Sequence, residues 1–387
     1  MTHRAPPLHA MLQGLIASPS VSSVSPAFDQ GNLAVIEILA GWLDGMGFQC
    51  EIIPLPQHPG KANLIATLGS GPGGLVLAGH TDTVPCDPER WQSDPFKLIE
   101  RDQRLYGLGT ADMKSFLGLA IEAARHINAA DLQQPLIILA TADEESSMDG
   151  ARELVRLGKP RARFAVIGEP TSMVPIHAHK GMMMEAIRIT GQSGHSSNPA
   201  LGNNALLGMY KVLGNLIDWQ QELADKYRDP IFDVPVPTLN LGHIHGGDNP
   251  NRICGHCELH IDLRPLPSMN IPELQGLLQQ RLQTVLAQTG LELAIRHLMP
   301  GTPAMATPRQ SEIVQAAEKL TGHTAEAAAY STEAPYLNHL GMETIVLGPG
   351  HIAQAHQPDE YLEQAAIKPM LGVLTHLIEK FCLRPAG

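Results

Sequence analysis

The chain has 387 residues, a formal net charge of −12, 43% hydrophobic residues and five scattered cysteines. This length predicts one large and one smaller domain of a soluble globular protein, and no apolar run approaches the roughly 20 residues of a membrane span. The acidic charge, with no basic cluster or aromatic platform to offset it, argues against nucleic-acid binding, and the odd cysteine count favours a reducing cytoplasm over a disulfide framework. Residues 1–7 lack the apolar segment and the cleavage site of a signal peptide.

Helices and strands alternate in the first part of the chain. Helix-period apolar residues predict helices over 7–16 and 31–46, and an amphipathic helix after Asp112. Apolar runs bounded by turn residues predict strands over 48–53, 63–68, 75–79, 136–142 and 164–167. Strands that alternate with helices predict an α/β fold, in which a mostly parallel sheet is flanked by helices.

The pattern changes after residue 181. The next elements are expected in the order strand, helix, strand, strand, helix, strand, over 184–190, 204–225, 238–244, 257–263, 272–288 and 291–297. This order is typical of a ferredoxin-like α+β sandwich. We therefore predict an inserted domain at 182–299 that interrupts a catalytic domain formed by 1–181 and 300–387. The first fold is expected to resume with a helix at 311–320, a strand at 344–347 and a helical segment from Tyr361.

One predicted strand ends in three consecutive acids, Asp143, Glu144 and Glu145, with no Lys or Arg among them. Such carboxylates repel one another unless a cation, a proton or solvent relieves them. Taken alone, this stretch would suit a solvated turn whose acids lie near the N-terminus of the helix at 148–157. The other strand ends favour a different interpretation.

Histidines and carboxylates follow several of the predicted strands. They are His80 and Asp82 after one strand, Glu144 and Glu145 after another, Glu169 after a third and His356 after a fourth, with Asp112 before a helix. Ligands in an open α/β sheet gather outside the carboxyl ends of the strands. Two histidines with several carboxylates form a ligand set for zinc, cobalt or manganese, and one carboxylate shared between two metals is chemically reasonable.

Four of these segments carry a resemblance to a known family: GHTD at 79–82, GTADMK at 109–114, ADEE at 142–145 and GEPT at 168–171. The chain resembles the M20 family of metal-dependent peptidases and deacylases across both expected domains, with no departure at a ligand position. Together with GEPT, the segment AHQPDE at 355–360 narrows the resemblance to the branch that acts on Nα-acetylornithine.

The resemblance implies a zinc-peptidase-like catalytic domain with an inserted ferredoxin-like dimerisation (lid) domain. It also implies a cytoplasmic amidohydrolase that converts Nα-acetyl-L-ornithine and water to L-ornithine and acetate in arginine biosynthesis. Its cofactors would be two divalent metal ions per subunit, Zn²⁺ with Co²⁺ able to substitute. In this assignment Asp112 bridges both ions, His80 and Glu169 complete one site, and Glu145 and His356 complete the other.

Two further acids would take part in catalysis. Asp82 would accept the second ring proton of His80 and so fix its imidazole. Glu144 would take a proton from the metal-activated water and later deliver it to the leaving amine, and burial with neighbouring carboxylates should raise the pKa of Glu144. The family also implies a cis peptide after Asp112.

The remaining candidates would meet the substrate. By the resemblance, His195 reaches across a homodimer interface and donates to the oxyanion, although it also suits an ordinary turn. Asn251, Arg252 and Arg264 are candidates for holding a substrate carboxylate, with Arg264 equally suited to be a solvated charge. Glu333 would suit the ornithine ammonium, or would be a plain loop carboxylate. The expected partners are an acetylated amino acid and a second subunit, without nucleic acid or membrane.

Two alternative functions stay open at this point. A succinyl-diaminopimelate desuccinylase is the nearest enzyme, but that pattern has a basic residue near 331–335, where this chain has proline. A non-catalytic relative would be expected to have lost Glu144 or a ligand, and none is missing.

Several other motifs have the spacing of metal sites without a clear partner. The pair Cys254 and Cys257 lacks a second pair, so it favours a structural role. His177 with His179, and His243 with His245, each place two imidazoles on one face of an extended segment. Most histidines of this kind are surface residues or are satisfied by hydrogen bonds.

Overall fold

The computed structural model describes residues 5–383, so the first four residues of the N-terminal segment lie outside it. The chain divides into two compact units. The first comprises Met1–His177, Thr307–Glu326 and Thr332–Gly387, and the second comprises Ala178–Ala306 and Ala327–Ser331. Across residues 5–383, every helix is too short or too polar to traverse a bilayer.

A nine-stranded sheet runs through the first unit within the described residues, in the order β1-β2-β6-β3-β7-β15-β8-β13, with β14 beside β8. Its last strands reach the boundary between the units, because β13 and parts of β8 and β14 are assigned to the second unit. Its strands are β1 (Gln49–Pro54), β2 (Ala62–Leu68), β3 (Leu75–His80), β6 (Leu136–Thr141), β7 (Phe164–Ile167), β8 (Ile176–His179), β13 (Met305–Ala306), β14 (Glu326–Ala328) and β15 (Glu343–Val346). The central strands β6, β3, β7 and β15 are parallel, and the pairs at both edges are antiparallel. Strands β3, β6 and β7 are buried throughout, as their apolar runs predict.

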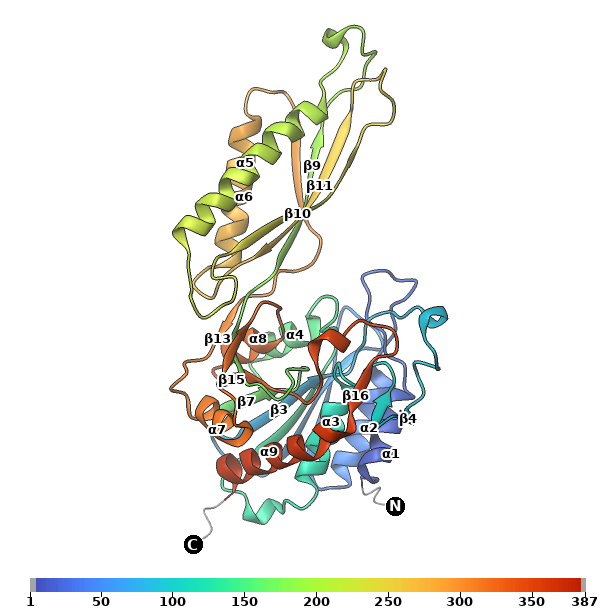
Figure 1. Ribbon diagram of the computed structural model, residues 1–387, viewed down its shortest axis with the longest axis vertical. Helices are drawn as coiled ribbons and strands as arrows, with labels where there is room; N and C mark the ends of the chain where they lie inside the picture. The colour runs from blue at the N-terminus through green and yellow to red at the C-terminus, as the bar shows by residue number, and fades with distance from the viewer. Residues whose placement is uncertain (1–4, 384–387) are drawn as a thin grey trace. The chain divides into compact units, whose positions relative to one another are not determined.

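Helices flank this sheet in two groups. They are α1 (Leu8–Ile16), α2 (Leu33–Asp44), α3 (Lys114–Ala124), α4 (Asp149–Leu157), α7 (Glu312–Thr321), α8 (Ala334–His339) and α9 (Gln364–Cys382). The helix α3 packs against α1 and α9, whereas α4 packs against α8 (Figure 1). The predicted fold class, α/β with a mainly parallel central sheet flanked by helices, is confirmed.

Short elements complete the first unit. The 3₁₀ helices of the chain are η1 (Pro88–Arg90), η2 (Ala129–Asp131), η3 (Pro199–Leu201, in the second unit) and η4 (Ile352–Gln354). A small antiparallel sheet joins β4 (Ile99–Arg101), β5 (Arg104–Tyr106) and β16 (Tyr361–Glu363) in the order β16-β5-β4. The prediction of helix from Tyr361 was therefore wrong for three residues, because this segment pairs with β5 before α9 begins at Gln364.

The second unit is an antiparallel α+β sandwich. It contains β9 (Met183–Thr190), α5 (Ala205–Lys226), β10 (Thr238–Gly246), β11 (His256–Arg264), α6 (Ile271–Leu286) and β12 (Glu292–His297). The sheet order is β10-β11-β9-β12. Asn204 and Asn270 start the two helices, because their side chains accept backbone N–H groups of the first turn. Both helices lie on the same face of the sheet (Figure 1).

The register of β11 separates a buried face from an open one. Its residues Cys257, Leu259, Ile261 and Leu263 alternate into the core beneath α5 and α6. All five cysteines of the chain are free, including Cys257 and its neighbour Cys254. The opposite face of β11 presents polar side chains.

Candidate metal centre

Three parallel strands of the first unit deliver acidic and imidazole side chains to one edge of the sheet. His80 is the last residue of β3, and the strands β6 and β7 on either side lead directly into Glu145 and Glu169. Parallel strands in adjacent positions end at the same edge, where open α/β sheets hold their ligands. The structure therefore brings these predicted residues together.

Asp112 lies at the centre of this group. Its Oδ1 is 3.1 Å from Nε2 of His80, and its Oδ2 is 3.7 Å from Nε2 of His356. His80 Nε2 is also 3.6 Å from Glu169 Oε1, and His356 Nε2 is 3.0 Å from Glu145 Oε2. Each oxygen of one carboxylate thus faces a different histidine–glutamate pair, which is the arrangement that two adjacent cations would require.

The electrostatics of this group also fit divalent cations. Burial raises the pKa of Glu144 and Glu169 well above the usual range, and it also raises the pKa of Glu145. Burial disfavours a charged His80, yet its hydrogen bond to Asp112 and the neighbouring carboxylates raise the pKa of His80 well above its usual value. The group holds more carboxylates than its two imidazoles can neutralise. The donor set of oxygen and nitrogen atoms, with this excess of negative charge, fits divalent metal ions.

Glu144 lies beside the ligands. One of its oxygens falls within 4.8 Å of ligand atoms of both His80 and Glu169. Its side chain is half-buried, at the turn that follows β6. It can therefore exchange a proton with a molecule held next to the cluster.

Asp143, the first of the three consecutive acids after β6, pairs with a lysine and does not join the cluster. Asp143 is buried, and its Oδ1 lies 2.6 Å from Lys61 Nζ and accepts from Ser22 Oγ at 2.8 Å. Lys61 also contacts Asp29 Oδ1 at 2.6 Å. The cation that relieves Asp143 thus comes from a lysine far upstream, and only Glu144 and Glu145 turn toward the cluster.

The contact between Asp82 and His80 differs from the predicted one. The Nδ1 of His80 lies 3.0 Å from the backbone carbonyl oxygen of Asp82 and 3.7 Å from its carboxylate Oδ1. The other carboxylate oxygen accepts the backbone N–H of Glu145 at 3.0 Å. Asp82 therefore orients His80 through its main chain and holds the Glu145 segment through its side chain.

Glu360 is a structural residue of the site to which the sequence assigned no role. Its carboxylate is buried and accepts the backbone N–H groups of Gly109 at 3.0 Å, Ala111 at 2.7 Å and Asp112 at 2.9 Å. It thereby fixes the loop that carries the central ligand. The peptide Asp112-Met113 in this loop is cis, as predicted. The segment 355–360 hinted at Glu360, but nothing in the sequence indicates its backbone partners.

The residues of the second unit that were predicted to contact substrate lie in two separate regions of that unit. His195 forms an antiparallel bridge with Arg252, and Ser196 N–H donates to the carbonyl of Asn251 at 3.0 Å. These exposed loops thus lie side by side. Arg264 is at the other end of β11, where its Nε lies 2.9 Å from Asp262.

Glu333 lies in the first unit, directly before α8. It is buried, and its Oε1 has no hydrogen-bond partner among residues 5–383. Burial raises the pKa of Glu333 to about 7. An ordinary loop carboxylate would be solvated, so this oxygen is suited to a cationic partner.

The rings of His177 and His179, a histidine pair noted in the sequence, make hydrogen bonds within the protein. The Nδ1 of His177 is 2.9 Å from the Thr307 carbonyl, and the Nδ1 of His179 is 2.8 Å from the Lys180 carbonyl. Burial lowers the pKa of His179 to about 4. Both rings are held by backbone groups.

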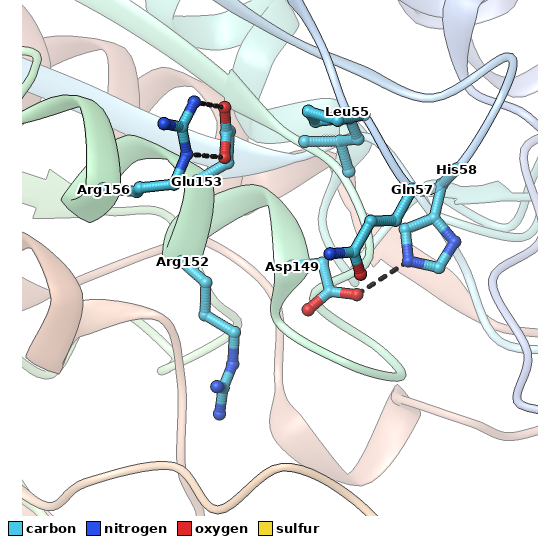
Figure 2. Close-up of a pocket in the computed structure, with 8 residues that line it drawn as sticks. Leu55, Gln57, His58, Asp149, Arg152, Glu153 and Arg156 are labelled. Carbon is cyan, nitrogen blue, oxygen red and sulfur yellow. Dashed lines mark hydrogen bonds and ion pairs between the residues drawn. The ribbon is translucent and has the colours of Figure 1, made fainter.

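A separate pocket of about 380 Å³ lies between the β1–β2 loop and α4. Its lining residues are Leu55, Pro56, Gln57, His58, Asp149, Arg152, Glu153 and Arg156. Figure 2 shows His58 paired with Asp149, and Arg156 making two contacts with Glu153. The two acids of this pocket, Asp149 and Glu153, each pair with a basic side chain, and Arg152 adds a positive charge, so the pocket lacks the excess negative charge of the cluster around Asp112.

Comparisons with known proteins identify the family of the chain. The model of the peptidase family M20/M25/M40 matches residues 76–380. Acetylornithine deacetylase of Edwardsiella ictaluri is 52% identical over 99% of this chain and 100% of its own length, and acetylornithine deacetylase of Photorhabdus laumondii is 49% identical over 99% of both. An M20 family metallo-carboxypeptidase of Sulfolobus solfataricus has the same fold, with a TM-score of 0.76 at 17% identity over 97% of this chain and 99% of that chain. A dinuclear metal-binding M20 peptidase of Bacillus subtilis matches with a TM-score of 0.64 at 15% identity over 96% and 98%. The chain belongs to peptidase family M20/M25/M40.

Proposed function

We propose that the chain is an acetylornithine deacetylase, which hydrolyses Nα-acetyl-L-ornithine to L-ornithine and acetate in the cytoplasmic synthesis of arginine. The observation that carries this proposal is the identity of about half of all residues, over the full length, with two relatives of that name. The five free cysteines are consistent with a reducing compartment.

The cofactors in this proposal are two divalent metal ions, Zn²⁺ with Co²⁺ as a substitute. Asp112 would contact both ions, His80 and Glu169 would hold one, and Glu145 and His356 would hold the other. Bound ions would polarise the acetyl carbonyl and lower the pKa of a water molecule. The contacts of the two Asp112 oxygens with two different histidines support this arrangement.

Glu144 is the general base and acid of the proposed reaction. Its carboxylate takes a proton from the attacking water and then donates it to the nitrogen of the leaving amine. Burial raises the pKa of Glu144, which brings its affinity for a proton closer to that needed in both steps. In this proposal Asp82 positions the ring of His80 through its backbone carbonyl, and it positions the Glu145 backbone through its carboxylate.

The substrate contacts are also part of the proposal. Asn251 and Arg252 would hold the α-carboxylate, with Arg264 as a further candidate. The buried Oε1 of Glu333, which has no hydrogen-bond partner within the described part of the chain, would receive the ornithine ammonium. His195 would donate to the oxyanion of the partner subunit's substrate.

A homodimer is required for this role of His195. Two features of the second unit support it. Helix α5 exposes an apolar stripe of Leu207 (66%), Tyr210 (77%) and Ile217 (56%), at helical spacing on one face. Strand β10 is at the edge of its sheet, with one side unpaired among the described residues.

The substrate is tested by ornithine release from Nα-acetylornithine with purified, zinc- or cobalt-loaded protein. We expect turnover of this substrate and none of succinyl-diaminopimelate. Removal of metal with a chelator should abolish the activity, and adding back Zn²⁺ or Co²⁺ should restore it. Turnover of only the succinyl compound would keep the metal centre but overturn the substrate, and activity that survives complete metal removal would overturn the mechanism.

The action of His195 across subunits is tested by mixing two inactive variants, His195→Ala and Glu144→Ala. If His195 acts on the partner's substrate, each mixed dimer holds one complete site. Random mixing should then recover about a quarter of the wild-type activity. A mixture that stays inactive while mixed dimers are detected by mass spectrometry would show that His195 serves its own subunit or no site.

A further inference from the structure

The buried side-chain amide of Asn63 joins the two ends of the loop that carries Glu144. This loop runs from Ala142, directly after β6, to Gly150 in the first turn of α4. The Oδ1 of Asn63 accepts the backbone N–H of Ala142 at 3.0 Å, and its Nδ2 donates to the carbonyl oxygen of Gly150 at 2.9 Å. One side chain thus satisfies a backbone group at each end of the 142–150 loop.

The two ends of the loop lie so close together that only glycine fits at one of them. The N–H of Gly150 donates to the carbonyl oxygen of Ala142 at 3.2 Å. A Cβ atom at position 150 would lie 2.3 Å from that carbonyl oxygen and 2.6 Å from Oδ1 of Asn63. A larger residue would therefore displace the backbone or the amide. Asn63 and Gly150 together form a closely packed base for the loop.

Asn63 lies on a strand that is paired on both sides. It belongs to β2, where it is fully buried and pairs with Ile53 of β1. The next residue, Leu64, pairs with Ala140 of β6, so the amide lies beside the end of the strand that leads into the loop. A side chain on a buried strand positions its partners more precisely than one on a loop.

The backbone inside the loop is strained. Asp143 and Met148 have φ angles of 59° and 58°, in the left-handed region that residues other than glycine rarely adopt. Such conformations persist only where the surrounding structure fixes them. The loop therefore depends on its contacts with the rest of the unit, and Asn63 supplies contacts at both of its ends.

Glu144 and Glu145 depend on the loop to different degrees. The backbone N–H of Glu145 donates to the carboxylate of Asp82, and the carboxylate of Glu145 contacts His356. Among residues 5–383, no hydrogen bond fixes the carboxylate of Glu144. The position of Glu144 therefore follows from the backbone of the loop.

We propose that Asn63 is a positioning residue of the hydrolytic site, which fixes the 142–150 loop so that Glu144 faces the metal centre. This inference rests on the proposed role of Glu144 in proton transfer. Loss of the amide would let Glu144 move, and a displacement of about 1 Å near a reacting group can cost about 10²-fold in rate. Glu145 would stay in place through its own two contacts, so metal binding would change little.

The test compares Asn63→Ala with the control Asn338→Ala. The control removes a half-buried amide of the same unit, which donates to the carbonyl oxygen of Met342 at 2.8 Å after α8. We expect Asn63→Ala to lower kcat by about 10–100-fold, with KM within about threefold of wild type and with unchanged metal content by elemental analysis. The control should keep kcat within about twofold. A folded Asn63→Ala enzyme with kcat within about threefold of wild type, or a kcat that falls only in proportion to lost metal, would overturn the proposal.

A double-mutant cycle tests whether Asn63 acts through Glu144. In the Glu144→Gln background, Asn63→Ala should lower kcat by less than about twofold, because the group that Asn63 positions can no longer transfer a proton. A further loss of about tenfold or more in the double variant would overturn the proposal, since the effect of Asn63 would then be independent of Glu144.

A second readout does not depend on activity. Hydrogen–deuterium exchange should become at least about threefold faster in peptides that cover the 142–150 loop of Asn63→Ala, and it should stay unchanged there in Asn338→Ala. Where Asn63→Ala does not fold, Asn63→Ser, which keeps a hydroxyl group at this position, takes its place in each measurement. Unchanged exchange in the loop would overturn the proposal. Faster exchange in a chain whose wild type does not hydrolyse acetylornithine would support the role of Asn63 in the loop and overturn only the proposed activity.

Discussion

Replacement of Glu144 by Gln is expected to lower kcat for acetylornithine by about 10²–10⁴-fold, because the amide cannot take a proton from water. Glu144 is not among the proposed metal ligands, so the variant should still bind two ions per chain. Steady-state ornithine release and elemental analysis of the same sample measure both quantities. In the wild type, activity should fall as the pH falls through the raised pKa of Glu144, since only the carboxylate form accepts a proton.

The matched control is Glu145→Gln, which alters the neighbouring acid. Glu145 lies 3.0 Å from His356, so this change should reduce bound metal as well as kcat. The two variants separate proton transfer from metal binding. A Glu144→Gln enzyme with kcat within tenfold of wild type and full metal content would refute the role of Glu144.

Replacement of Lys61 by Met is expected to lower the free energy of unfolding by about 3–5 kcal/mol. The lysine is only 6% exposed and contacts both Asp143 and Asp29 at 2.6 Å. Its loss leaves the buried Asp143 carboxylate without a counter-charge. Urea denaturation, followed by fluorescence and circular dichroism, measures the change in the transition midpoint.

Two controls test the cause of this destabilisation. The double variant Lys61→Met/Asp143→Asn should recover part of the loss, because it removes the orphaned charge. Arg156→Met breaks the exposed pair with Glu153 and should change stability by less than about 1 kcal/mol. A Lys61→Met protein as stable as the Arg156→Met protein would show that the buried pair does not stabilise the fold.

The sequence was most informative where one buried strand leads directly into a polar side chain. The strands β3, β6 and β7 are continuous apolar runs, and their adjacency as parallel strands follows from the alternation with helices. These two facts were enough to predict that His80, Glu145 and Glu169 would gather at one edge. The family resemblance then supplied roles that geometry alone does not distinguish, such as the separate role of Glu144.

Contacts between distant segments could not be predicted in the same way. Lys61 reaches Asp143 across 82 positions, and Glu360 reaches Asp112 across 248. Neither pair leaves a periodic signal, because the partners are set by how the chain folds back on itself. The three-residue strand β16 was missed for a related reason, since three residues are too few to show alternation.

A β-bulge in β10, where the register against β11 shifts between Leu241 and His243, is a third feature that the sequence could not predict. One extra residue in a strand reverses which side chains face outward from that point on, and sequence alternation alone does not reveal where this occurs. His243 and His245 therefore could not be placed beside His260 before the register was known.

Glu360 has a further consequence for the proposed metal centre. It lies four residues after His356, and its carboxylate accepts a hydrogen bond from the backbone N–H of Asp112. Asp112 is the proposed shared ligand, and His356 belongs to only one of the two proposed sites. The side chain of Glu360 thus links the segment that carries His356 to the loop that carries Asp112, and we expect order in one segment to favour order in the other. Filling of the first metal position would then prepare the second, and the centre would load as a pair.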